Sequence, residues 1–316
     1  MLERNQLDTA QVAEIIRQQF PDVSPATVTY LGEGCDSSAF DVNSQWVFRF
    51  PKRADVEQQL LLEFRVLPVL AERSPVPLPE FRFHGQPSVR FPRYFGGYAK
   101  LPGVPGIGVD PHTVPFGKWA PTLARFLSWL HAFPVRDATR LGVNHERVAS
   151  LIEEVRADAL ADFEFLNQVA PDAPLEDWHA YLIEGPPMSA PASSTEVVVH
   201  RDLAAEHVLC DPVRRTLTGI IDWSDIAISD ALIDFVGVFH WGGEAFIDAV
   251  LSSYDGPLDE TALPRARFMA ACRGVADVAF GLETSRREYI DAGIRALSLC
   301  ADSAPAFRTR GLTSRE

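Results

Sequence analysis

Apolar and polar residues alternate with two different periods over the first hundred residues of the chain. Helical spacing predicts helices at residues 9–20 and 56–71, and prolines follow both. Alternation at every second position predicts strands at residues 28–30, 39–42, 46–50, 80–84 and 90–98. Gly32 and Gly34 indicate a tight turn between the first two strands. These elements predict a small antiparallel sheet with accompanying helices.

The segment at residues 101–108 is rich in proline and glycine, which favour neither helix nor strand, and helical patterns dominate beyond it. Helices are predicted at residues 118–133, 146–169, 175–183, 231–241 and 245–254, with two more within 260–299. Short apolar strands are predicted at residues 197–199, 208–210 and 217–221. We therefore predict an α+β protein with two lobes: residues 1–100 form a small N-terminal antiparallel-sheet lobe, and residues 101–316 form a larger, mainly helical C-terminal lobe.

Composition and charge narrow the possible partners. The chain has 316 residues, of which 47% are hydrophobic and 23% charged, as in an ordinary folded protein. Its formal net charge of -14 disfavours nucleic acids and anionic membranes, because both require a basic surface. A cationic small molecule would be attracted, although acidity alone also serves solubility. The lack of a long apolar run and of a secretory signal predicts a cytoplasmic protein.

A short motif carries the main indication of chemistry. His200-Arg201-Asp202 follows an apolar strand, and His207 comes five residues after Asp202. This is the spacing of a phosphotransfer loop, in which the aspartate orients the acceptor hydroxyl and a metal ligand follows. Asp202 is therefore the candidate catalytic residue. Because Mg²⁺ prefers oxygen ligands, His207 either binds the metal directly, binds it through water, or orients Asp202.

Asp222 is the second candidate metal ligand. It ends the apolar strand at residues 217–221, so its carboxylate needs a partner near the protein interior. A metal ion that bridges nucleotide phosphates would be one such partner, and a salt bridge to an arginine such as Arg201 would be another.

The N-terminal lobe carries candidate phosphate contacts. Gly32 and Gly34 open a loop in which Ser37 stands at the position of a third glycine. Arg49 lies on a strand that follows, facing away from Phe48 and Phe50, and Glu63 lies on the next predicted helix. This order predicts that Arg49 binds phosphates while Glu63 holds it in place. Lys52 is an alternative to Arg49.

These motifs resemble the aminoglycoside phosphotransferase family, which has a protein-kinase-like fold, and especially its 2″-phosphotransferase and macrolide phosphotransferase branch. The matching segments are residues 32–40, 48–51, 97–103, 200–207 and 221–230. The resemblance implies that Gly34, Ser37 and Ser38 belong to the phosphate loop. It also implies that residues 97–101, which include the candidate nucleotide contacts Tyr98, Ala99 and Lys100, form the hinge whose backbone receives the purine ring.

The resemblance implies Mg²⁺ as the cofactor, ATP or GTP as the phosphoryl donor, and a hydroxyl of an aminoglycoside antibiotic as the acceptor. A macrolide or another small metabolite is the alternative acceptor, and the apolar Phe239, Trp241 and Phe246 would suit a less polar one unless they belong to the core. A nucleotide-binding pseudo-enzyme is a further hypothesis, because Ser37, Arg49 and His207 depart from the common kinase pattern. A protein acceptor is disfavoured, because the chain has no room for an activation loop after Asp222.

Overall fold

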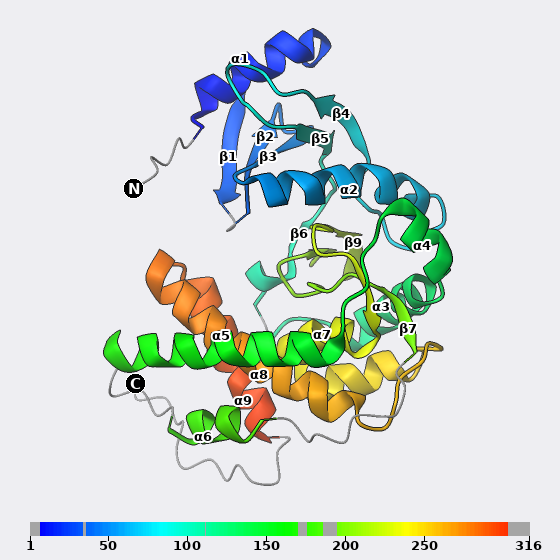
Figure 1. The fold of residues 1–316 in the computed structure, drawn as a ribbon, viewed down its shortest axis with the longest axis vertical. Coiled ribbons are helices and arrows are strands. Elements are labelled where there is room, and N and C mark those ends of the chain that lie inside the picture. Colours follow the sequence, from blue (N-terminus) through cyan, green and yellow to red (C-terminus); the bar gives the residue numbers. More distant parts are fainter. Residues whose placement is uncertain (1–6, 34–35, 111, 170–175, 186–194, 303–316) are drawn as a thin grey trace. The chain divides into compact units, whose positions relative to one another are not determined.

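Five antiparallel strands form the sheet of the first part of the chain in this computed structural model, which describes residues 7–33, 36–110, 112–169, 176–185 and 195–302. The strand order is β1-β2-β3-β5-β4 (Figure 1), with β1 Val28–Glu33, β2 Ser37–Val42, β3 Trp46–Pro51, β4 Phe81–Gly85 and β5 Phe95–Ala99. The prediction began β5 at residue 90, which is too early. Pro92 has no N–H to donate to the ladder, and the Tyr94 N–H donates to the Glu57 carboxylate at 2.6 Å instead.

The two faces of this sheet carry different helices. Helix α1 (Thr9–Gln19) begins at a capping box formed by Asp8 and Gln11, and its apolar side shares a buried cluster with Phe48 and Phe50 of β3. Helix α2 (Ala54–Ala71) packs against β3 and β5. Because side chains alternate across a strand, Arg49 lies on the opposite side of β3 from Phe48 and Phe50 and meets α2.

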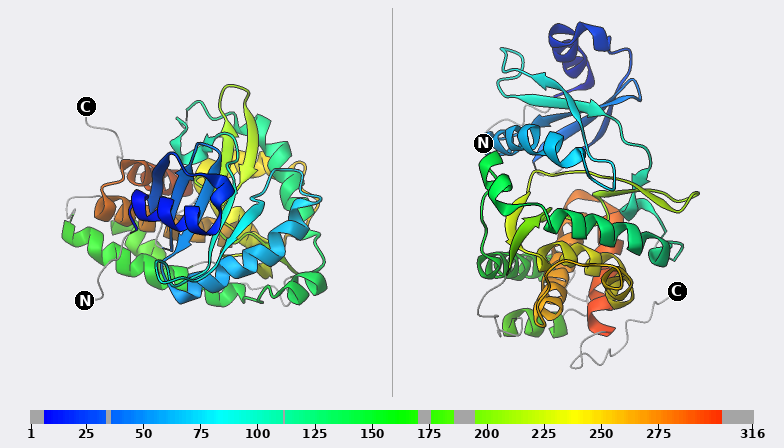
Figure 2. Two further views of the ribbon diagram at one scale, coloured as in Figure 1. Left: turned by 90° about the horizontal axis from the view of Figure 1, so that it is seen from above. Right: turned by 90° about the vertical axis from the view of Figure 1, so that its right-hand side faces the viewer.

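Helices make up most of the second part of the chain. Their bounds are α3 Phe116–His131, α4 Val135–Leu141, α5 Val148–Val169, α6 Glu176–Glu184, α7 Leu232–Leu251, α8 Ala262–Thr284 and α9 Arg287–Asp302. Helix α8 packs against α5, α7 and α9 (Figure 2). The sequence predicted two helices where α7 runs, and the backbone does break there, because Gly243 adopts φ 64° and ψ -161°. Helix α4 was not predicted.

Short strands accompany these helices. Strand β7 (Glu196–Val199) pairs with β10 (Ala227–Asp230), and β6 (Val104–Pro105), β8 (Val208–Asp211) and β9 (Thr216–Ile220) form a three-stranded sheet. The sequence missed β10, whose four residues carry no pattern of their own and are ordered by pairing with β7. It also missed β6 and the 3₁₀ turn at Gly106–Gly108, within the segment predicted to be neither helix nor strand.

The chain folds into two compact units. One comprises residues 1–102 together with 219–225, and the other comprises residues 103–218 and 226–316. The α+β class is confirmed, since the antiparallel sheet comes first and the mainly helical part follows. The functional division between residues 100 and 101 stays a prediction. Among the described residues, no helix combines the length and hydropathy that crossing a bilayer requires.

Candidate active site

Arg49 links two carboxylates in the sheet-containing unit. Its Nη1 donates to both carboxylate oxygens of Glu63, at 2.9 and 2.8 Å, and its Nη2 donates to Asp222 Oδ1 at 3.0 Å. The Glu63 side chain is fully buried, whereas that of Asp222 is 38% exposed. The expected pairing of Arg49 with Glu63 is therefore present. A planar guanidinium suits this arrangement, since its separate N–H groups reach two carboxylates at once.

Burial and charge oppose each other within this cluster. Burial raises the pKa of the Glu63 carboxyl to about 7, an increase that the attraction of Arg49 only partly offsets. Burial alone would lower the pKa of Arg49, but Glu63 and Asp222 raise it well above the ordinary value. Arg49 is therefore a permanent cation, and its position depends on the ionised form of Glu63.

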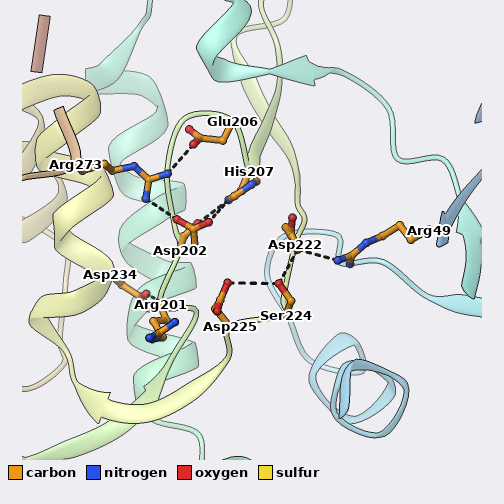
Figure 3. A network of polar contacts seen from close by, with 10 residues as sticks. All are labelled: Arg49, Arg201, Asp202, Glu206, His207, Asp222, Ser224, Asp225, Asp234 and Arg273. Carbon is orange, nitrogen blue, oxygen red and sulfur yellow. Dashed lines mark hydrogen bonds and ion pairs between the residues drawn. The ribbon is translucent and has the colours of Figure 1, made fainter. Parts of the chain in front are cut away.

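The turn after β9 presents the Asp222 carboxylate. Asp222 has a φ of 62°, in the left-handed region that aspartate tolerates better than most residues, and Trp223 beside it is fully buried. The Ser224 hydroxyl donates to Asp222 Oδ1 at 3.0 Å, so serine and Arg49 bind the same oxygen (Figure 3). The arginine paired with Asp222 is Arg49, while Arg201 forms an ion pair with Glu146 at 2.6 Å.

A buried carboxylate holds the loop that carries Asp202. Asp234, at the start of α7, accepts the backbone N–H groups of His200 at 3.0 Å and Arg201 at 2.9 Å, and it also contacts His131 Nε2 at 3.1 Å. Arg201 has a φ of 73°, an unfavourable conformation for a bulky residue. The two hydrogen bonds from consecutive amides compensate for this strain. Asp234 thus holds the backbone of the loop in place.

Two side chains contact Asp202 within the helical unit, and one of them also contacts Glu206. His207 Nδ1 lies 2.8 Å from the backbone oxygen of Asp202 and 3.2 Å from its Oδ2. Arg273 of α8 donates to Asp202 Oδ1 at 2.5 Å and to Glu206 Oε1 at 2.6 Å (Figure 3). His207 therefore makes the orienting contact that was one of its three predicted roles.

The charges around Asp202 keep it ionised. Burial alone would raise the pKa of the Asp202 carboxyl, but Arg273, His207 and His200 together hold that pKa far below its ordinary range. The pKa of Glu206 is also lowered, because Arg273 and His207 outweigh its burial and its repulsion by Asp202. A carboxylate with so little affinity for a proton is suited to accept a hydrogen bond rather than to remove a proton early in a reaction.

A cavity of about 270 Å³ lies beside this loop within the helical unit. Its described lining residues are Gly106, Ile107, Gly108, Val109, Asp110, Ala205, Glu206, His240, Trp241, Glu288, Asp291, Ala292 and Arg295. The Ile107 N–H donates to the Ala205 oxygen at 3.2 Å, which ties one wall to the loop after Asp202. Four carboxylates and one arginine are among these residues. Arginines outside the lining pair with three of the carboxylates: Arg273 with Glu206, Arg286 with Glu288 and Arg287 with Asp291.

The predicted nucleotide contacts lie around the five-stranded sheet. Gly34 falls outside the described residues, while Ser37 begins β2 and the neighbouring Ser38 is buried. Tyr98 and Ala99 end β5, and Tyr98 is buried, which raises the pKa of its hydroxyl.

Lys100 follows β5 with both of its nitrogen groups engaged. Its N–H donates to the Gln45 oxygen at 2.8 Å, and its Nζ donates to Asp41 at 2.5 Å. A purine contact through Lys100 would therefore use its carbonyl group.

The residues around Asp222 suit a magnesium ion. Asp222 and Asp225 supply hard carboxylate oxygens on one short turn, and Ser224 donates to both side chains, at 3.0 and 3.4 Å. No group of three or more His, Cys, Asp or Glu suited to a metal occurs within the described ranges. Mg²⁺ is commonly held by one or two carboxylates together with nucleotide phosphates. His207 uses Nδ1 for Asp202, so any role as a metal ligand would fall to its Nε2.

Sequence reasoning missed several residues of the site. Glu206 lies between Asp202 and His207, so its position was a usable signal. Arg273 is 71 residues from Asp202 on a helix, and nothing in the local sequence marks it. Asp202 and Asp222 belong to different compact units, and their convergence on one centre stays a prediction. Phe239, Trp241 and Phe246 are buried, as expected for core residues, although Trp241 also lines the cavity.

Comparison with known proteins identifies the relatives of this chain. Residues 27–269 match the model of the phosphotransferase enzyme family. The structure is similar to the GDP and kanamycin complex of APH(2″)-IIIa, with 31% identity, a TM-score of 0.69, and coverage of 93% of this chain and 99% of the other. The GDP complex of wild-type aminoglycoside 2'-phosphotransferase-IIIa gives 30% identity and a TM-score of 0.72, over 94% of this chain and all of the other (100%).

Two other relatives are more distant. Macrolide 2'-phosphotransferase type I gives 25% identity and a TM-score of 0.60, over 94% of this chain and 99% of the other. The uncharacterized protein YcbJ of Bacillus subtilis (strain 168) is 25% identical over 276 residues, which are 83% of this chain and 85% of that protein. The likeness extends over nearly the whole chain in each structural comparison.

Proposed function

This chain belongs to the phosphotransferase enzyme family, and we propose that it transfers the γ-phosphate of ATP or GTP to a hydroxyl of a cationic small molecule, an aminoglycoside antibiotic. The observation that carries this proposal is the ionised Asp202 carboxylate, whose loop contributes Ala205 and Glu206 to the wall of a carboxylate-lined cavity. Solved relatives named for GDP and kanamycin complexes support the same donor and acceptor classes.

The sheet-containing unit supplies the proposed donor site. Arg49 would bind nucleotide phosphates while Glu63 holds its guanidinium. Gly34, Ser37 and Ser38 would cover the phosphates, and residues 98–100 would receive the purine. Asp222, with His207 as a second candidate ligand, would hold Mg²⁺, which when bound neutralises charge on the β- and γ-phosphates.

Asp202 would orient the acceptor rather than act as a strong base. Its carboxylate accepts a hydrogen bond from the acceptor hydroxyl, whose oxygen forms the new bond to the γ-phosphorus. The bond from that phosphorus to the β–γ bridging oxygen breaks, and the nucleoside diphosphate leaves with the electron pair. Phosphoryl transfer has a loose transition state, so the hydroxyl proton leaves late, to Asp202 or to solvent, and a weak base is sufficient.

The cavity supports a cationic acceptor. Glu288 and Asp291 of α9 and Asp110 lie on its walls, and Glu206 connects it to Asp202 through their shared partner Arg273. Aminoglycosides carry several ammonium groups and many hydroxyls, which matches carboxylate walls beside a hydroxyl-orienting group.

Nucleoside diphosphate release tests this proposal directly. The purified chain is assayed with MgATP or MgGTP against kanamycin, other aminoglycosides, macrolides and simple amino sugars, and products are identified by mass spectrometry. We expect stimulation by aminoglycosides with a product heavier by one phosphoryl group. The aminoglycoside assignment fails if no member of that class raises the rate above that of the nucleotide alone.

A less polar acceptor is the second candidate, and Trp241 favours it. The indole lines the cavity and packs against Trp119, with ring centroids 5.4 Å apart, so it presents a rigid apolar surface. Similarity to a macrolide phosphotransferase points in the same direction. Stimulation by macrolides and not by aminoglycosides would select this candidate in the same assay.

A further inference from the structure

Arg273 occupies the space between two carboxylates of the proposed acceptor site. One terminal nitrogen lies 2.5 Å from Asp202 Oδ1 and the other 2.6 Å from Glu206 Oε1. The side chains of Arg273, Asp202 and Glu206 are 23%, 30% and 12% exposed. The three groups thus form a compact, largely desolvated charge cluster in which one guanidinium serves two acids.

Without a cation, this arrangement would be unstable. Two carboxylates this close repel each other, and their burial adds a desolvation cost to each ionised form. A cation between them removes both penalties. An ammonium group of an acceptor could satisfy the same two oxygens, and aminoglycoside acceptors carry such groups beside their hydroxyls.

The chain itself therefore provides the cation that a substrate would otherwise contribute. Arg273 comes from α8 and is anchored by its helix, so its guanidinium is already in place before any acceptor binds. An acceptor ammonium at this point would meet a positive charge instead of an open pair of acids. Glu288 and Asp291, farther along the cavity wall, are also paired with arginines, Arg286 at 2.9 Å and Arg287 at 3.5 Å. Arg273 differs from these arginines because it also contacts Asp202.

We propose that Arg273 determines acceptor specificity: it keeps Asp202 in its hydroxyl-orienting position and fills the place of a substrate ammonium, so the acceptor must present its reactive hydroxyl on a part without positive charge. This inference rests on the proposed phosphotransfer function. Arg273 is a positioning residue, since it acts through Asp202.

Matched acceptors test the specificity. Aminoglycosides are paired with derivatives in which a single amino group beside the phosphorylated hydroxyl is replaced by hydroxyl. The wild-type chain should prefer the deaminated member by about tenfold in kcat/KM, and Arg273→Ala should shift that ratio toward the amino member by at least about tenfold. Arg273→Lys, which keeps the charge, should retain the wild-type preference with lower turnover. Arg267→Ala, on the same helix, should leave the ratio unchanged.

Chemical rescue tests the cation site without any acceptor. Slow nucleotide hydrolysis by Arg273→Ala is measured with and without added methylguanidinium or ethylammonium at about 10–50 mM, well below denaturing concentrations. Rescue by about tenfold, absent in Asp202→Asn and in Arg267→Ala, is the expected result. Circular dichroism checks that each variant is folded. If Arg273→Ala does not fold, the acceptor preference of Arg273→Lys is used instead, and the inference requires that this variant keep the wild-type preference.

The results of the two assays distinguish a role of Arg273 in specificity from a purely structural role. Equal losses for both members of every acceptor pair, with no rescue by either cation, would show that Arg273 only stabilises the fold and would overturn the inference. A wild-type preference for the amino member would also overturn it. If no hydroxyl compound stimulates the wild-type chain, the proposed function fails, while the rescue assay still decides whether a cation between Asp202 and Glu206 restores turnover.

Discussion

Arg49 donates a hydrogen bond to Asp222 at 3.0 Å although 173 positions separate the two residues in the chain. The contact exists because residues 219–225 fold with the sheet-containing unit rather than with their neighbours in sequence. It joins the proposed phosphate-binding cation to the proposed metal-binding carboxylate. Together with the bidentate contact to Glu63, it fixes the guanidinium from two sides.

Replacing Arg49 should weaken nucleotide binding. Arg49→Met removes the buried cation and should raise KM for the nucleotide by about 10- to 100-fold, while Arg49→Lys retains the charge but loses the fork and should have a smaller effect. Arg65→Met, on α2 but exposed, is the matched control. Nucleotide affinity measured by calorimetry should follow the same order. Equal nucleotide affinities for Arg49→Met and wild type would show that Arg49 does not bind the nucleotide.

Asp202→Asn should separate chemistry from binding. The amide cannot be an ionised hydrogen-bond acceptor for the hydroxyl, so kcat should fall by about 10²- to 10⁴-fold while the nucleotide Kd changes by less than about threefold. Asp255→Asn, at an exposed position, serves as the control. Single-turnover product formation is the appropriate measurement. Turnover of Asp202→Asn near the wild-type rate would show that Asp202 has no catalytic role.

Glu63 should make stability depend on pH between about 4.5 and 8. Burial raises its folded-state pKa from 4.5 to about 7. The protonated form is therefore favoured in the folded state, and the contribution of Glu63 to stability is fully present below pH 4.5 and is lost as the pH rises through 7. Over this window wild type should lose about 3 kcal/mol relative to Glu63→Gln.

Urea unfolding followed by tryptophan fluorescence measures this difference at each pH. A difference in unfolding free energy that stays constant from pH 4.5 to about 8 would show that Glu63 has an ordinary pKa in the folded chain. The cost at neutral pH is the consequence of ionising a fully buried carboxylate to hold Arg49.

Gly237 of α7 should tolerate no side chain. A Cβ at this position would lie 1.8 Å from the Leu203 oxygen, in the loop directly after Asp202. Gly237→Ala should therefore cost at least about 2 kcal/mol and displace the loop, with a loss of turnover. Gly117→Ala is the matched control, because Gly117 is helical and has nothing within 4 Å of its added Cβ.

The control variant at Gly117 should become more stable, whereas Gly237→Ala should become less stable. Gly117→Ala should stabilise the protein by about 0.5–1 kcal/mol, since alanine loses less backbone entropy in a helix. Thermal unfolding compares the two variants directly. A Gly237→Ala protein as stable and active as wild type would show that the α7 contact with the loop is adaptable.

The sequence by itself determined most of the elements and the positions of the candidate site residues that lie in local motifs. Alternation and helical spacing predicted most strands and helices, since each pattern reports which side of an element is buried. The order of Arg49 and Glu63 predicted their ion pair, because one strand and the next helix are close neighbours in the chain. Asp202 and His207 share one loop, and their contact was one of the alternatives that the local spacing left open.

Only the tertiary structure decided the partners that come from distant segments. Arg273 reaches Asp202 and Glu206 from α8, Asp234 braces His200 and Arg201 from α7, and β10 exists because β7 pairs with it. No local pattern encodes these contacts, because a buried charge or an unpaired strand edge takes whichever partner the packing brings near it. Residue types and the hydrophobic periodicity of a segment can be read from the sequence. The neighbours of a residue depend on how the chain packs.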